Sequence, residues 1–212
     1  SFTDTAGNSN TAATQFNWTY DGISPAMTIT ATEVSDGQAS ADSTLFLTFT
    51  SSEATTDFAI GDIAISNSFL SNFNTISSTV YTATLTPTTQ GAVTVDIAAN
   101  SFTDTAGNSN TAATQFNWAY DNIVPTIVIA ASEVSDGATS NNSSLSLTFT
   151  TSESTTNFSS SDVGVSGGIL SSFSGSGATY TATFTPSDSG ATTIDVGAAS
   201  FTDTAGNSNT AA

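Results

Sequence analysis

The sequence predicts an all-β fold made of tandem antiparallel β-sandwiches, and three observations support this prediction. Apolar residues alternate with Thr, Asn, Gln or Asp over short stretches, the pattern of a strand with one buried and one wet face. Turn-forming residues separate these stretches, and none of them has helical periodicity. The same order of stretches recurs with a period close to 100 residues, which is the size of one small β-domain.

The expected strands can be assigned in order along one repeat. Apolar alternation predicts strands at 27–31, 45–49, 81–85 and 93–97, and another at 16–20, which is copied at 116–120. The stretch 58–65 and a short stretch near 70–73 are two further candidates. About seven strands in this length are expected for an immunoglobulin-like sandwich. Phe16, Trp18 and Tyr20 alternate on one face of their strand and are expected to belong to a core.

Long identical segments carry the repeat and indicate where domains join. SFTDTAGNSNTAATQFNW occupies residues 1–18 and 101–118, and its first thirteen residues return at 200–212. Pro25 and Pro125 follow Asp21 and Asp121 closely, and they belong at strand entrances or linkers because proline cannot donate a ladder hydrogen bond. We therefore expect residues 1–20 to be the last strand of a preceding or neighbouring-subunit domain. Residues 21–120 form a complete domain, and residues 121–212 form a domain that lacks its last strand.

Two explanations remain open for a chain that begins with the last strand of another domain and ends with a domain lacking that strand. The chain is either a window from a longer array of identical domains, or a molecule whose residues 14–20 fill the open last-strand position of a neighbouring copy. The second explanation would join chains head to tail by strand addition.

The ionisable residues are all acidic, and this excludes several classes of function. The chain has 18 Asp and Glu residues, no Lys, Arg or His, no Cys, and a formal net charge of −18. Such a chain cannot neutralise the phosphates of nucleic acids or anionic lipids, and it has no run of apolar residues long enough to span a membrane. It has no imidazole base, thiolate or Schiff-base lysine, and nothing specifies a cleft with paired carboxylates, so no enzyme is expected. Carboxylate oxygens suit hard cations, and calcium is the cofactor that elimination favours.

Several carboxylates are expected to gather at the joints between domains. In a seven-stranded sandwich with strands lettered A to G in chain order, the linker, the end of strand B and the loop between strands F and G (the FG loop) share one end, which brings Asp121, Glu153 and Asp203 together. The acidic residues where strand A ends should reach the same joint from the preceding domain, and Asn122 can complete the ligand shell. The predicted ligands are Asp21, Glu33, Asp36, Glu53, Asp104, Asp121, Asn122, Glu133, Asp136, Glu153 and Asp203. The alternative is that these acids shape turns, as Asp does in DTAGN and in EVSDG.

Several motifs resemble those of a known family. The opening strand with P-x-(I/V)-x-I, the LTFTSSE and LTFTTSE segments, the FxxxDI block, the YTATLTP segment and the DTAGN loop are similar to the tandem bacterial Ig-like domains of large secreted surface proteins and adhesins. The resemblance covers the whole chain. It implies an antiparallel sandwich, export from the cell and a role as a repeated extender unit or surface contact. The acidic joint is similar to the calcium-stiffened joints of cadherin-like arrays.

The sequence therefore predicts an extracellular structural module of a filament or adhesin stalk, secreted or at the cell surface, that calcium stiffens between domains. Its partners are expected to be neighbouring copies of the same domain or chain, arranged head to tail. The alternative interpretation is a surface-binding module for glycan or for ice. A flat exposed patch of aromatic or Thr side chains, outside the core faces, would favour that alternative.

Overall fold

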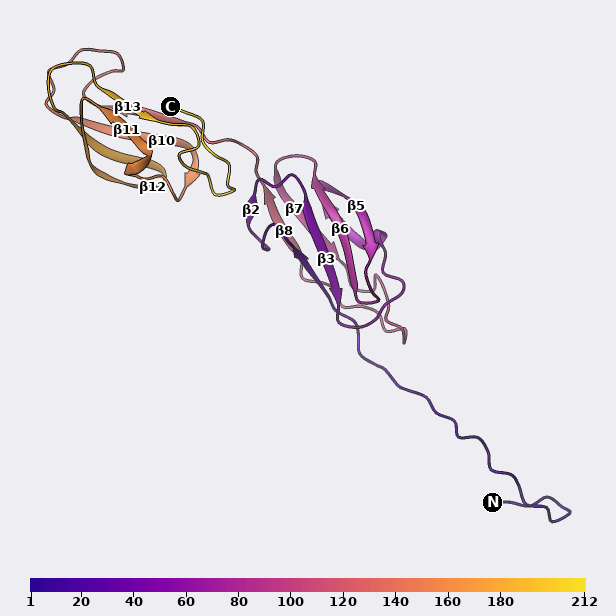
Figure 1. Cartoon of the computed structure of the whole chain (residues 1–212). Helices are drawn as coiled ribbons and strands as arrows, with labels where there is room; N and C mark the ends of the chain where they lie inside the picture. Colours follow the sequence, from indigo (N-terminus) through magenta and orange to yellow (C-terminus); the bar gives the residue numbers. More distant parts are fainter.

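The computed structural model describes all 212 residues and contains two β-sandwiches that follow one another along the chain (Figure 1). The all-β prediction is confirmed. The first sandwich contains Met27–Ala31 (β1), Ala39–Ser40 (β2), Leu45–Ser51 (β3), Ile63–Ser66 (β4), Ser68–Thr75 (β5), Val80–Pro87 (β6), Gly91–Ile97 (β7) and Phe116–Tyr120 (β8). The second contains Ile127–Ala131 (β9), Leu145–Thr155 (β10), Val163–Ser166 (β11), Gly168–Pro186 (β12) and Thr193–Val196 (β13). Short 3-10 helices lie at Ile60–Asp62 and Ser160–Asp162.

The first sandwich packs two four-stranded sheets around one core. Their strand orders are β1-β3-β6-β5 and β2-β8-β7-β4, and every pair is antiparallel except β2 with β8. Alternate residues of β3 and β7 point inward, so Leu47, Phe49, Val95 and Ile97 are completely buried. The period-two apolar pattern of the sequence therefore becomes the two inner faces of the sandwich.

Phe58 lies at the centre of this core, although its stretch does not form the strand expected at 58–65. Its ring centroid lies 5.0 Å from that of Tyr81 and 5.2 Å from that of Phe102. The carboxylate of Asp62 accepts a hydrogen bond of 2.8 Å from the Ala59 amide. The Asp62 amide in turn donates to the Ala59 carbonyl at 3.0 Å and closes a 3-10 turn, so the strand begins only at Ile63.

The second sandwich has an open edge where the first has β8. Its sheets are β12-β10-β9 and β11-β13, and no strand pairs with the free edge of β13. Its core cluster contains 10 buried residues, against 16 in the first domain. Ile194 of β13 is half-buried, whereas its counterpart Val95 is completely buried. Without a strand at this position, the sandwich leaves part of its apolar surface uncovered.

Residues 1–20 contact neither sandwich as a strand, and they run away from the first domain as an extended segment (Figure 1). Phe16 is 87% exposed and Trp18 71% exposed, whereas the identical residues Phe116 and Trp118 in β8 are only 3% and 1% exposed. Phe16, Trp18 and Tyr20 therefore belong to neither core of this chain, and their burial in the core of a preceding or neighbouring domain stays a prediction. The alternation identifies a strand that can be buried, but no sheet of this molecule covers it.

Candidate functional site

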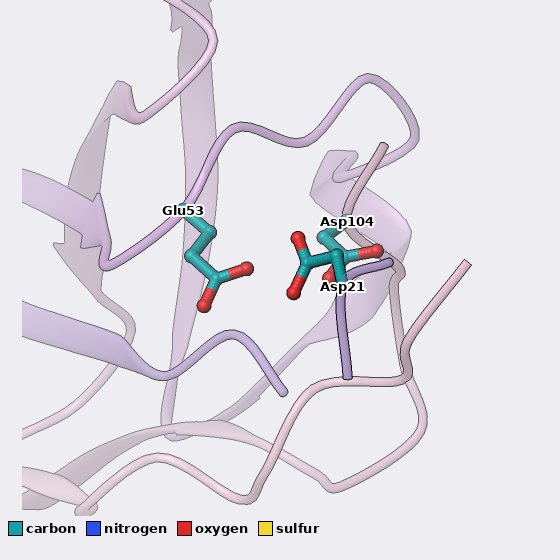
Figure 2. A group of neighbouring side chains, drawn as sticks. All are labelled: Asp21, Glu53 and Asp104. Atoms are coloured by element: carbon teal, nitrogen blue, oxygen red, sulfur yellow. The ribbon is translucent and has the colours of Figure 1, made fainter. Parts of the chain in front are cut away.

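A group of three carboxylates lies at the start of each sandwich, and the two groups are equivalent. The first triad is Asp21, Glu53 and Asp104, and the second triad is Asp121, Glu153 and Asp203. In each triad one carboxylate oxygen from every residue lies within 4.8 Å of the others. Figure 2 shows Glu53 reaching the first triad from one side and the two aspartates from the other. The prediction that linker, strand B and FG loop bring these acids together agrees with this geometry.

The DTAGN loop fixes one aspartate of each triad. Asp104 Oδ1 accepts hydrogen bonds of 2.8 Å from the amides of Ala106 and Asn108, and its Oδ2 accepts one from Asn108 Nδ2. The same three bonds form around Asp4, where no sandwich surrounds the loop. The loop geometry is therefore local to its sequence, and the turn-forming role considered for this Asp is present together with its place in the triad.

The DTAGN loop also holds the linker aspartate. Asn108 Nδ2 donates to the backbone carbonyl of Asp21 at 3.2 Å, and Asn207 Nδ2 donates to that of Asp121 at 3.0 Å. These asparagines belong to the same loops as Asp104 and Asp203. Sequence reasoning did not single them out, although an Asn four residues after an Asp in an identical segment is a signal for such a loop.

The triads concentrate negative charge without any cationic partner. Desolvation raises the pKa of Glu53, and the charges of Asp21 and Asp104 raise it further. Desolvation likewise raises the pKa of Glu153, with contributions from the second triad's two aspartates. The Asn108 side chain holds the pKa of Asp104 below its ordinary value, so this carboxylate stays ionised beside Glu53.

One further observation indicates that the second triad suits a hard divalent cation. Glu153 Oε2 is buried and has no hydrogen-bond partner, which costs free energy unless another group satisfies it. All the side-chain donors of the triad are oxygens, the ligand type that calcium prefers. A cation among them would satisfy the buried oxygen and remove the repulsion among the carboxylates.

The other carboxylates among the predicted ligands belong to neither triad. Glu33 accepts a hydrogen bond of 2.9 Å from the Phe46 amide, and Glu133 accepts one of 2.8 Å from the Ser146 amide. These glutamates thus bind the start of the next strand in their own domains. Asp36 accepts the Asn117 amide of β8 at 2.7 Å. Asp136 is exposed and belongs to neither triad, and Asn122, next to Asp121 in the linker, is exposed.

Asp57 is an acidic residue outside the triads with a structural role. Its carboxylate accepts hydrogen bonds of 2.7 Å from Thr55 Oγ1 and Thr103 Oγ1, and 3.0 Å from the Thr103 amide. Partial desolvation acts to raise its pKa, but the bonds from both threonines outweigh it and lower the pKa below the ordinary 3.8. In the second domain Asn157 makes the equivalent contacts.

This difference gives a pH-dependent prediction. Because the folded pKa of Asp57 is lowered, its contribution to stability is complete above about pH 4 and is lost as the pH falls through the folded pKa. Asp57→Asn should keep the hydrogen bonds to both threonines, as Asn157 does, and should reduce the loss of first-domain stability as the pH falls below about 4. Urea unfolding at several pH values measures this, and an unchanged pH slope would contradict the assignment. Asp57→Ala should lower the free energy of unfolding of the first domain by about 1 kcal/mol at neutral pH.

Aromatic side chains are exposed on the outer face of one sheet in the first domain only. Phe46 of β3 and Phe69 of β5 are 46% and 51% exposed and share their face with the threonines of β6. Their counterparts in the second repeat are Ser146 and Ile169. Because the aromatic pair is not repeated, this face does not favour a glycan-binding function for the repeat as a unit.

Comparison with known proteins gives one family match and one structural likeness of note. Residues 21–120 and 121–212 each match the model of a bacterial Ig-like domain. No curated protein matches the chain. The crystal structure of invasin, described as a bacterial integrin-binding protein, is similar with 18% sequence identity and a TM-score of 0.44. The likeness covers 80% of this chain and 36% of the invasin chain. No helix has the length and apolar character needed to cross a membrane.

Proposed function

The chain belongs to the bacterial Ig-like domain family, and we propose that it is an extracellular structural repeat module of a filament or adhesin stalk. Its two domains repeat the same fold and the same triad, which extends reach without adding chemistry. Its role in this proposal is mechanical, and calcium at the joints between domains supplies the stiffness.

The observation that carries the calcium proposal is the second triad. Asp121 comes from the linker, while Glu153 and Asp203 come from the second domain. A cation held by all three would fix the linker to the domain that follows it. Calcium accommodates about six to eight oxygen ligands, so water and backbone carbonyls would complete the shell. Without the cation, repulsion among the carboxylates favours conformations in which the linker moves away.

Small-angle scattering of the whole chain tests this role. In calcium we expect a larger and more narrowly distributed distance between the two domains than in excess EDTA, at the same ionic strength. Glu153→Gln should abolish the difference, because it removes a triad carboxylate. Glu133→Gln is the matched control, since Glu133 lies outside both triads. Identical curves with and without calcium for the wild-type chain would contradict stiffening by the cation.

We also propose that copies of the chain associate head to tail by strand donation. The segment containing Phe16 and Trp18 is exposed, and the identical segment forms β8 on the edge of β7 in the first domain. The corresponding edge of β13 is free in the second domain. Residues 14–20 of one copy can therefore pair with β13 of another in the register that β8 uses, and would bury both aromatic side chains there.

A further inference from the structure

The end of the first sandwich makes direct contacts with the second triad's surroundings. Gln90, in the loop between β6 and β7, donates from Nε2 to Asp121 Oδ1 at 2.9 Å. The Asp121 amide donates to the carbonyl of Ser40 in β2 at 3.1 Å. The Ala41 amide donates across the joint to the carbonyl of Ala205 at 3.1 Å. The first domain therefore contacts both the linker and the DTAGN loop of the second.

These contacts reach the elements that carry two of the three carboxylates. Asp121 is held directly by the Gln90 side chain. Asp203 accepts the Ala205 amide at 2.8 Å, and the carbonyl of the same Ala205 accepts the Ala41 amide of the first domain. Movement of one domain relative to the other would therefore move Asp121 away from Asp203 and break the bond between Ala41 and Ala205.

The chemistry of Gln90 suits a positioning role beside a cation site. Its amide donates a hydrogen bond to the carboxylate but carries no charge. A Lys or Arg at this position would hold Asp121 equally well, but its positive charge would compete with a bound cation. Gln90 thus orients the carboxylate and leaves its negative charge available.

We propose that Gln90 is a positioning residue through which the first domain sets the geometry of the second triad, so that cation binding and docking of the two domains are coupled. This inference rests on the proposed role of the triad as a calcium site. Gln90 faces Asp121 just beyond the β7–β8 pair, so their bond ties Asp121 to the first domain, whereas Glu153 and Asp203 belong to the second. The docked arrangement brings these carboxylates together and should therefore bind the cation more tightly. By linkage, the bound cation favours docking to the same extent.

The first triad provides an internal comparison. Asp21 Oδ1 accepts the Ile23 amide at 3.1 Å, just as Asp121 Oδ1 accepts the Ile123 amide at 3.1 Å. Only Asp121 receives the additional bond from Gln90. The two triads otherwise share residue types and loop geometry. The second triad should therefore bind calcium more tightly than the first.

Calcium titration of the whole chain by calorimetry, with scattering as a second readout, tests the inference. The wild-type chain should show two classes of site. Gln90→Leu, which keeps the size but removes the amide, should weaken the tighter class about five- to tenfold and leave the weaker class unchanged. It should also broaden the interdomain distance distribution. Ser189→Ala is the matched control, because Ser189 occupies the position of Gln90 in the second repeat and should alter neither readout.

The possible outcomes separate this inference from the proposed function. If calcium binds and Gln90→Leu has the affinities and scattering of the wild-type chain, the coupling through Gln90 is overturned while the calcium role stands. If the wild-type chain binds no calcium in either class, the calcium role and the inference both fail. Selective weakening of the tighter class with a broadened distance distribution supports both.

Discussion

Replacing Trp118 with alanine is expected to lower the free energy of unfolding of the first domain by about 3–5 kcal/mol, the usual cost of removing a large buried aromatic side chain. Trp118 is 1% exposed in β8 and belongs to the first core cluster. Its removal leaves a cavity between the sheets. Such a loss is a large fraction of the stability of a small domain. Urea unfolding followed by circular dichroism measures it, and a loss below about 1 kcal/mol would contradict the core assignment.

Trp18→Ala is the matched control, because Trp18 lies in the same FNW sequence but is 71% exposed. It should leave the free energy of unfolding of the first domain unchanged.

The same Trp18→Ala variant tests strand donation between copies of the chain. The wild-type chain should associate with increasing concentration in sedimentation experiments, and Trp18→Ala should weaken that association. A wild-type chain that stays monomeric at all concentrations would rule out donation between copies.

Much of the fold could be predicted because two-residue periodicity reports directly on which face of a strand is buried. The strands around Leu47 and Val95 follow from alternation alone, and they form the inner faces of the sandwich. The segment after Phe58 could not be predicted in this way. There a carboxylate, Asp62, binds a backbone amide and closes a turn in a stretch whose apolar pattern suits a strand.

The triads could be predicted because topology alone decides which chain segments share an end of the sandwich. The hydrogen-bond partners of individual side chains could not be predicted from topology. Glu33 and Asp36 were placed at the joint by the same topological reasoning, but each carboxylate binds a backbone amide within the first domain, to Phe46 and Asn117 respectively. The role of Gln90 depends on how one domain docks on the next, which no periodicity within a domain encodes.

The second large effect is that of calcium on thermal stability. A cation present at 100 times its dissociation constant adds about 2.7 kcal/mol to the folded state. For a domain of this size the unfolding midpoint should rise by roughly 10 °C. The rise of the second domain's midpoint should be absent for Glu153→Gln. In EDTA this variant should unfold at or above the wild-type midpoint, because the folded environment raises the pKa of Glu153 and so disfavours its charge.

Thermal unfolding of the whole chain, in calcium and then in excess EDTA at fixed ionic strength, is the most direct test of calcium at the joints. We predict a clear calcium-dependent rise for the wild-type chain and for Glu133→Gln. We predict no rise of the second domain's midpoint for Glu153→Gln. An unchanged wild-type midpoint would show that the triads are not calcium sites and that their aspartates serve only to shape the linker and the DTAGN loops.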